Sequence, residues 1–383
     1  MAGRAPLHQS LVRVYPAEHH IAATLRLALV PGIGPQLWKQ LLEHFRTPQA
    51  VLAASPQELR QIQGIGIQTS QAILAADLDR SAEETLTVCQ QHGIEVLTDS
   101  ETSYPQPLRE IPAPPSLLFL RGSLHPCDTL AIAIVGTRRA TNYGRCQAQR
   151  FAAELSRAGL TIVSGLARGV DATAHQAALD TGGRTIAVMG SGLLHIYPPE
   201  HRSLARRIQD CGALLSEFPP NQKPSRSTFP QRNRIITGLC LGVLVVEAPA
   251  KSGALISAQH ALEQGRDIFV IPGPVNQKNS RGCHQLLRDG ATLVESPQDV
   301  LDELGPLCKE IPQSDGRVIR HPAELSLNTQ EQAVLNAIPT TPTHIDTVIT
   351  ESQLAPNQVL STISALEIRQ LVRRLTGQQV VRN

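Results

Sequence analysis

The chain has 383 residues, of which 41% are hydrophobic and 18% charged, and its formal net charge is +2. This length predicts two or three domains with buried cores, and the absence of a long apolar stretch excludes a membrane span. The first residues show no secretory signal, and the seven cysteines form no CxxC pair and no zinc spacing. We therefore expect a cytoplasmic protein with reduced thiols and without a metal site or a disulfide framework.

The positive charge is concentrated in the middle of the chain. Residues 131–240 hold 14 Lys and Arg against six Asp and Glu, so the remainder of the chain is net acidic. A basic segment of this kind indicates an anionic ligand, and a chance unevenness in the sequence is the alternative explanation.

Residues 21–80 are predicted to form a small helical domain. The sequences VPGIG at 30–34 and IQGIG at 62–66 are each followed by a helical pattern. A glycine turn of this kind between short helices resembles the helix-hairpin-helix (SAM-like) motif, in which backbone N–H groups contact a DNA phosphate. Few Lys or Arg flank either turn. We therefore consider two roles for this domain equally supported: contact with DNA, and packing against the rest of the protein without any contact with DNA.

Residues 81–305 are predicted to form a Rossmann-like α/β domain. Short apolar runs alternate here with helical stretches, which indicates a doubly wound parallel sheet with helices on both faces. The runs are continuous rather than alternating, as expected for strands buried on both faces. The predicted strands are AIAIVG, LTIVSG, TIAVMG, ALLSEF, LGVLVVEA and DIFVIPG.

A polar linker is expected over residues 306–326, followed by a last domain over 327–383. Three short helices and a hairpin that turns at Thr376-Gly377 are predicted here, and this arrangement is typical of a winged-helix domain. The third helix, within 356–370, is poor in basic residues. We therefore favour a protein-interaction or packing role over the reading of a DNA groove.

Small and hydroxyl residues follow several of the predicted strands. Ligands of doubly wound sheets bind outside the carboxyl ends of the strands, where hydroxyl groups and N–H groups at helix starts donate to oxyanions. We predict that these strand ends converge on one anion pocket, with full charges from Arg138 and Lys251. The strand ends are Gly136-Thr137-Arg138, Ser164-Gly165, Gly190-Ser191-Gly192 and Lys251-Ser252-Gly253.

The glycine pattern does not fit a nucleotide cofactor. Arg138 occupies the position at which the G-x-G-x-x-G fingerprint needs its second glycine to admit a pyrophosphate. The GxxxxGK[ST] pattern of a Walker ATPase is absent. We therefore expect no cofactor.

Three other features could suggest catalysis, and a structural role is favoured for each. Asp171 and His175 lie four apart on one helix face, as an acid–base pair would, but a helix-start carboxylate and a hydrogen-bonded histidine are expected. Glu247 is interpreted as an orienting carboxylate rather than a catalytic acid. Cys283 and His284 are adjacent, so they point in different directions, and no third group completes a nucleophilic site. No catalytic residue is predicted.

The central segment closely resembles the DNA-processing protein A family (DprA/Smf), which are bacterial binders of single-stranded DNA. The resemblance implies that the protein assists the loading of a RecA-type recombinase in natural transformation and forms a homodimer through this segment. The resemblance rests on stretches that occur in order and at natural spacing: IVGTRRATNYG, IVSGLARGVDATAH, AVMGSGLLHIYPPEH, LLSEFPP, FPQRNRIITGL, VVEAPAKSGALISAQHALEQGRDIFVIPG and GATLVES.

The resemblance also implies a set of residues that contact the DNA phosphates. Arg232 either extends this basic surface or pairs with an acidic neighbour. Two departures from the family pattern lie near the expected pocket: Leu194 replaces an acidic residue, and Cys283-His284 replace Thr or Ser followed by Asn. The expected contacts are Gly136, Thr137, Arg138, Lys251, Ser252 and Gly253, with Ser164, Gly165 and Arg234 as pocket neighbours.

Two other functions compete with the binding of single-stranded DNA. Rossmann-like nucleotide N-glycosidases of the lysine-decarboxylase-like group share the first glycine loop, but their P-G-G-x-G-T loop with acidic residues corresponds here to APAKSGALISAQHALEQG. A free-nucleotide sensor would use the same pocket without a dependence on oligonucleotide length. Because aromatic residues make up only 3% of the chain, we expect phosphate contacts to dominate over base stacking.

Overall fold

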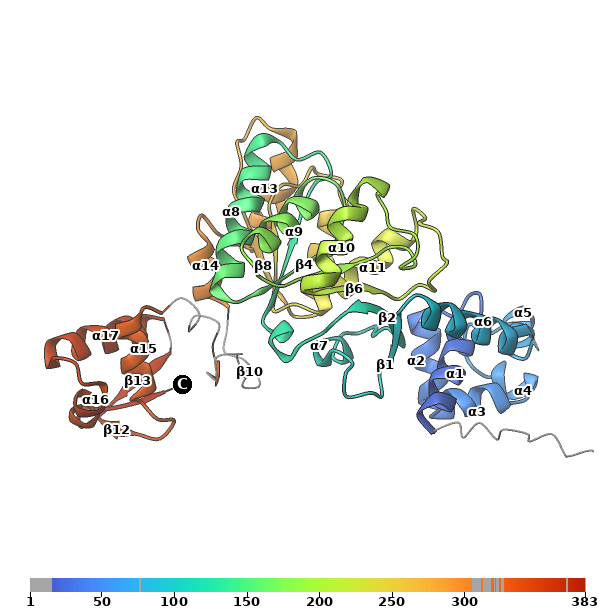
Figure 1. Cartoon of the computed structure of the whole chain (residues 1–383), viewed down its shortest axis with the longest axis horizontal. Helices are drawn as coiled ribbons and strands as arrows, with labels where there is room; N and C mark the ends of the chain where they lie inside the picture. The colour runs from blue at the N-terminus through green and yellow to red at the C-terminus, as the bar shows by residue number, and fades with distance from the viewer. Residues whose placement is uncertain are drawn as a thin grey trace, which may run out of the picture.

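The computed structural model of the protein describes residues 16–75, 77–304, 311–312, 318–319, 321, 324, 327–369 and 371–382. A group of helices at the N-terminal end is followed by a large α/β part and by a small C-terminal group of helices and strands (Figure 1). Most of the predicted linker over 306–326 lies outside the described residues. Within it, β10 (Ile311–Pro312) and β11 (Val318–Ile319) pair in antiparallel fashion.

The N-terminal helices confirm the helix-hairpin-helix prediction. The two predicted glycine turns precede α2 and α5, and Gly32 and Gly64 adopt positive φ angles of 89° and 94°, which glycine adopts at little cost. The first turn borders a cavity shared with Glu217 of the α/β part, an arrangement expected of a packing module. The helices are α1 (Pro16–Ala28), α2 (Pro35–Phe45), α3 (Pro48–Ala53), α4 (Pro56–Leu59) and α5 (Ile67–Ile73).

The predicted domain boundary at residue 80 falls inside one continuous helix, α6 (Asp77–Gln91). Buried residues of α6, such as Cys89, join Leu25 of α1 and Phe119 of the sheet in one apolar core. Since α1 and α6 contribute to the core of the α/β part, the packing of the two parts is continuous across this boundary.

The α/β part is built on a nine-stranded sheet with the order β1-β2-β6-β5-β4-β3-β7-β8-β9. The six predicted apolar runs form β3 to β8, which pair in parallel. β1 and β2 were not predicted, and they extend the sheet in antiparallel fashion beyond β6. The strands are β1 (Glu95–Thr98), β2 (Leu117–Gly122), β3 (Ala131–Val135), β4 (Thr161–Ser164), β5 (Thr185–Val188), β6 (Ala213–Ser216), β7 (Gly242–Val245), β8 (Asp267–Val270) and β9 (Thr292–Leu293).

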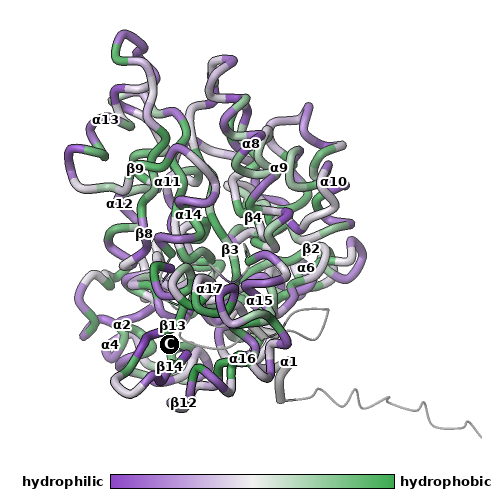
Figure 2. Tube along the Cα trace, turned by 90° about the vertical axis from the view of Figure 1, so that its left-hand side faces the viewer, coloured by the Kyte–Doolittle hydropathy of each residue, from purple (hydrophilic) through white to green (hydrophobic). Residues whose placement is uncertain are grey.

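Helices cover both faces of the sheet, as predicted. Ile132 and Ile134 of β3 pack with Phe151 of α8 on one face, and Ala133 packs in the core that contains Ile235 of α11 on the other. Figure 2 shows the hydrophobic colour concentrated along β3, β4 and β8. The helices are α7 (Gln106–Arg109), α8 (Asn142–Ala158), α9 (Val170–Asp180), α10 (Arg202–Cys211), α11 (Thr228–Gly238), α12 (Gly253–Glu263), α13 (Arg281–Arg288) and α14 (Pro297–Glu303), with short 3₁₀ turns η1 (Pro126–Thr129), η2 (Pro199–His201) and η3 (Lys278–Ser280).

The C-terminal residues confirm the winged-helix prediction. Val348, Ile363 and Val380 are fully buried in a core that joins the three helices to the hairpin. The hairpin turns at Gly377, whose φ is 78°. The elements are α15 (Thr329–Asn336), β12 (Thr343–His344), α16 (Ile345–Ser352), α17 (Pro356–Ile368), β13 (Val372–Leu375) and β14 (Gln379–Arg382). Across the described ranges, no helix combines the length and the apolar character needed to cross a membrane.

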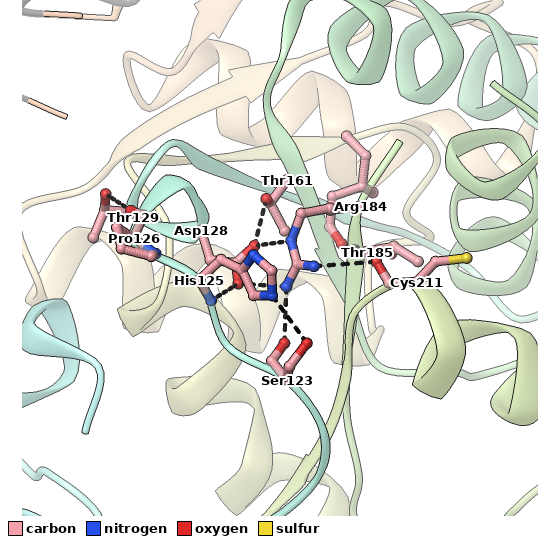
Figure 3. A network of polar contacts seen from close by, with 10 residues as sticks. Ser123, His125, Pro126, Asp128, Thr129, Thr161, Arg184, Thr185 and Cys211 are labelled. Atoms are coloured by element: carbon pink, nitrogen blue, oxygen red, sulfur yellow. Dashed lines mark hydrogen bonds and ion pairs between the residues drawn. The ribbon is translucent and has the colours of Figure 1, made fainter. Parts of the chain in front are cut away.

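A polar network fixes the connection between β2 and β3 (Figure 3). The buried carboxylate of Asp128 accepts hydrogen bonds from Nε and Nη2 of Arg184, both at 2.8 Å. It also accepts one from Oγ1 of Thr161 at 2.8 Å. Arg184 Nη2 donates in addition to the Ser123 carbonyl at 2.8 Å. Because Thr161 begins β4 and Arg184 immediately precedes β5, the network joins the antiparallel extension to the amino edge of the parallel strands.

Candidate functional site

A cleft of about 780 Å³ opens at the carboxyl ends of β3 and β7. These strands are neighbours in the sheet, and the chain proceeds from β3 to β4 on one side and from β7 to β8 on the other. Such a topological switch point is where ligands bind in doubly wound sheets. Residues that line the cleft include Gly136, Thr137, Arg138, Arg139, Asp171, Tyr197, Arg226, Phe229, Arg232, Lys251, Ser252 and Gly253.

The loop after β3 forms one wall of the cleft. At Gly136 an added Cβ would lie 2.5 Å from the Val170 side chain, so only glycine lets the loop pack this closely on α9. Thr137 N–H donates to the Glu247 carbonyl at 2.8 Å, which anchors the loop to the end of β7. The Arg138 side chain is exposed, and its guanidinium carbon lies 5.0 Å from the ring centroid of Phe229. The loop therefore presents a cation beside an aromatic ring.

The side chain of Glu247 orients this loop through hydrogen bonds. Its buried carboxylate accepts hydrogen bonds from Thr141 N–H at 2.9 Å and from Thr141 Oγ1 at 2.5 Å. Thr141 in turn caps α8 by accepting from Gly144 N–H at 3.1 Å. A Cβ at Gly144 would lie 2.3 Å from the carboxylate, so the arrangement requires glycine there. These contacts are those expected of an orienting carboxylate.

The loop after β7 forms the opposite wall and leads into the N-terminus of α12. Ser252 is the N-cap residue, and its side chain makes no capping hydrogen bond. Its Oγ is buried and has no hydrogen-bond partner among the described residues. An added Cβ at Gly253 would meet nothing within 4 Å, so the backbone here is open to a ligand. With the exposed Lys251, this helix start offers N–H groups, a hydroxyl group and a charge to an anion.

The floor of the cleft comes from α9 and α11. Arg232 is buried and donates from Nη1 to the carbonyl of Gly165 at 2.8 Å and to that of Val188. Burial lowers its pKa to about 10. Burial raises the pKa of Asp171, while the charge of Arg232 opposes the shift. Asp171 accepts from Gly165 N–H at 3.1 Å, so the charged groups of the floor hold the structure of the strand ends.

Three predicted pocket neighbours do not lie in the cleft. Ser164 is fully buried and donates to the Ile134 carbonyl at 2.6 Å, and Gly165 lies behind the Arg232 guanidinium. Arg234 lines a different cavity and forms an ion pair with Glu217 at 2.5 Å. Residues two apart on a helix point about 200° apart, so Arg232 faces the cleft and Arg234 faces away from it.

Two cations and two aromatic residues of the cleft were missed by the sequence analysis. Arg139 and Arg226 are exposed cations. The sequence signal for Arg139 was its place beside Arg138, whereas for Arg226 it was the positive charge of the central segment. Tyr197 and Phe229 are half-buried, with ring centroids 5.6 Å apart. The low aromatic content of the chain gave no indication that two of its few aromatic rings meet in one cleft.

The two departures from the family pattern also lie outside the cleft lining. Leu194 packs against an apolar core. Burial raises the pKa of the Cys283 thiol to about 11, which opposes its use as a nucleophile. The neighbouring His284 ring contacts the Gly273 carbonyl at 2.9 Å.

Other groupings of polar side chains are structural. His175 is fully buried between Thr185 Oγ1 at 2.7 Å and the N–H of Leu166 at 3.4 Å, and burial lowers its pKa to about 3. Ser123 and His125 lie within hydrogen-bond distance, but Asp128 accepts from the backbone N–H of His125 instead of its ring. They therefore form no catalytic triad. The described part of the chain holds no cluster of three or more His, Cys, Asp or Glu suited to a metal ion.

Comparison with known proteins assigns the chain to a family. The model of DNA recombination-mediator protein A matches residues 95–305, the DprA winged helix domain matches 318–378, and a SAM-like helix-hairpin-helix tandem matches 25–76. The protein Smf of Synechocystis sp. is 35% identical over 397 residues, which cover 96% of this chain and 100% of that protein. The DNA processing protein DprA of Streptococcus pneumoniae is 46% identical over 200 residues, which cover 52% of this chain and 71% of that protein.

Solved structures agree with this assignment. The X-ray structure of DprA from Streptococcus pneumoniae matches with a TM-score of 0.65 and 34% identity, and the match covers 74% of this chain and 98% of that one. The chain therefore belongs to the DprA/Smf family of DNA recombination-mediator proteins.

Proposed function

We propose that this protein binds single-stranded DNA in the cleft at the ends of β3 and β7 and assists the loading of a RecA-type recombinase onto that DNA, in DNA recombination and natural transformation. The observation that supports this proposal most directly is the arrangement of exposed cations around the N-terminus of α12. Arg138, Arg139, Arg226 and Lys251 are exposed on the cleft walls, whereas the carboxylate of Asp171 is buried.

The two walls supply complementary groups for a phosphate. Lys251, Ser252 Oγ and the N–H groups at the start of α12 lie on one wall, and Arg138 lies on the other. Charge-assisted hydrogen bonds of this kind are about twice as strong as neutral ones. Because Glu247 and Thr141 hold the Arg138 loop in place, little ordering is required when the phosphate binds.

The aromatic rings favour a single strand over a duplex. Phe229 lies beside the Arg138 guanidinium, and Tyr197 lies beside Phe229, so an unpaired base next to the bound phosphate can contact these rings. Stacking of this kind tolerates any base. In a duplex the bases are paired and face inward, so a rigid double helix would reach the cleft with only one or two phosphates.

The proposed partners are a second copy of the chain and the recombinase. β9 is an edge strand of the sheet, and Leu293 on it is 49% exposed. An exposed apolar edge of this kind favours pairing with another chain, which supports a homodimer. The recombinase is supported by the family description as a recombination mediator. The cysteines of the described residues are free, in keeping with the cytoplasm as the proposed location.

Binding is expected to weaken steeply with salt and to favour single strands. For single-stranded DNA, log affinity falls with log salt at about −0.7 per phosphate neutralised, so four cations give a slope of roughly −3 per protomer. A salt titration of fluorescent single-stranded and duplex oligonucleotides of equal length measures both properties. A slope near zero would contradict an electrostatic cleft, and equal affinity for the duplex would contradict the single-strand preference.

Nucleotide hydrolysis is not expected from this site. Asp171, which lines the cleft, accepts a hydrogen bond from Gly165 N–H, and Glu247 accepts hydrogen bonds from Thr141, so neither carboxylate is placed to activate water. Incubation with nucleoside monophosphates and detection of free base is the test. Steady base release that is abolished by Glu247→Gln would replace the binding function with an N-glycosidase. Affinity independent of oligonucleotide length would instead indicate a free-nucleotide sensor.

A further inference from the structure

A second basic loop lies against the cleft, and the cleft itself does not include it. This loop, residues 274–281, connects β8 to α13 and carries the exposed cations Lys278 and Arg281. Between them in the sequence, Asn279 donates from Nδ2 to the carbonyl of Arg139 at 3.0 Å. Since Arg139 lines the cleft, this hydrogen bond fixes loop 274–281 at the border of the DNA site.

Hydrogen bonds hold both ends of this loop. Just before it, the Pro272 carbonyl accepts from the hydroxyl group of Tyr143 on α8 at 2.7 Å. Just after it, Gly282 N–H donates to the Ala248 carbonyl at 2.7 Å. The loop is thereby anchored to the segments that follow both β3 and β7, so its cations have a fixed position relative to the two walls of the cleft.

The charged side chains of this region are all positive. Residues 271–288 contain Lys278, Arg281 and Arg288 but no Asp or Glu. No ion pair within the described residues involves Lys278 or Arg281. Placing two cations beside Arg139 without an ion-pair partner raises the electrostatic energy of the free protein. A polyanion that passes over this border would lower that energy.

We propose that Arg139, Lys278 and Arg281 form an outer basic rim that binds the phosphates of the strand where it leaves the cleft. The proposal rests on the proposed function and extends it from one pocket to a path along the protein surface. Lys278 and Arg281 are one and two residues from Asn279, so their Cα atoms lie within about 4–7 Å of the Cα atom of Asn279, whose side chain contacts Arg139. Consecutive phosphates of one strand can therefore pass from the cleft to the rim.

The test is a comparison of oligonucleotide lengths in the full-length protein. Fluorescence anisotropy is measured with labelled oligothymidylates from a dinucleotide upward, for the wild type and for the Lys278→Ala/Arg281→Ala double variant. The dinucleotide is expected to bind both proteins equally, because it fills only the cleft. On long oligonucleotides the variant is expected to bind roughly tenfold more weakly, and its salt slope is expected to be smaller by about 1.4.

Two further variants make the result specific. Arg157→Ala removes an exposed cation at the far end of α8 and is expected to leave affinity at every length unchanged. Lys278→Arg/Arg281→Lys keeps both charges and is expected to retain wild-type affinity. Because the side chains of Lys278 and Arg281 are exposed, the thermal unfolding midpoint of each variant is expected to match that of the wild type.

The possible outcomes distinguish DNA binding at the rim from DNA binding in the cleft. Unchanged affinity of the double alanine variant at every length, with binding still lost in Arg138→Ala, would overturn the rim and leave the proposed function intact. Equal weakening at every length would also overturn it, because the two residues would then act within the cleft. If Arg138→Ala also bound DNA like the wild type, the proposed function would fail together with the rim.

Discussion

Replacing Arg138 by alanine is expected to weaken the binding of single-stranded DNA by about 1.5–3 kcal/mol, because a hydrogen bond to a charged group is lost. This corresponds to roughly a 10- to 150-fold rise in Kd. Arg138 is exposed at the cleft wall, and the loop that carries it is held by Thr137 and Glu247. Removal of the side chain therefore leaves the fold intact. Fluorescence anisotropy at low salt measures the change.

Lys251→Ala is expected to weaken binding in the same direction. The two cations lie on opposite walls of one cleft, so they interact with the same stretch of phosphates, and the double variant is expected to lose less than the sum of the single losses. Arg157→Ala is the matched control, since Arg157 lies in the last turn of α8, away from the cleft. Wild-type affinity in a folded Arg138→Ala protein would rule out this cleft as the DNA site.

Replacing Asp128 by alanine is expected to lower the free energy of unfolding by about 3 kcal/mol, the lower end of the range for breaking a buried ion pair. The change removes the acceptor of two hydrogen bonds from Arg184 and one from Thr161 (Figure 3). The lower end applies because the Arg184 side chain is 22% exposed, so that water can solvate part of the guanidinium group. The shift in thermal unfolding measures the effect.

An exposed ion pair of the same type provides the comparison. Asp180 and Arg207 lie 3.0 Å apart with about half of each side chain exposed, so Asp180→Ala is expected to cost less than about 1 kcal/mol. Equal effects of the two substitutions would contradict a stabilising role for the Asp128 network. DNA binding below the unfolding temperature is expected to persist in Asp128→Ala, because the network lies at the amino edge of the sheet and the cleft at the carboxyl edge.

The sequence determined the features that depend on local pattern. Continuous apolar runs identified β3 to β8, and the glycine turns and the final hairpin identified the two flanking groups of elements. The residues that follow β3 and β7 were also identified, because their chemistry stands directly in the sequence: glycines, hydroxyls and two cations at strand ends. The order of neighbouring strands was not needed for any of these predictions.

Features that depend on the environment of a segment were not predicted from the sequence patterns. α11 (Thr228–Gly238) was not predicted, because its residues from Arg232 to Gly238 are all buried although several of them are polar. The alternation of apolar buried and polar exposed residues that indicates a helix is therefore missing. The antiparallel strands β1 and β2 were also missed, and the predicted boundary at residue 80 fell inside α6. In each case neighbouring elements supply the burial that local periodicity does not record.

Only the tertiary structure decided which residues of the predicted site meet. The sheet order brings the ends of β3 and β7 together, but it leaves Ser164 behind them, where its hydroxyl group bonds to the backbone. The rotation of α11 turns Arg232 to the cleft and Arg234 to Glu217. Strand order and helix rotation depend on packing between segments far apart in the chain, and no local pattern of residues specifies them.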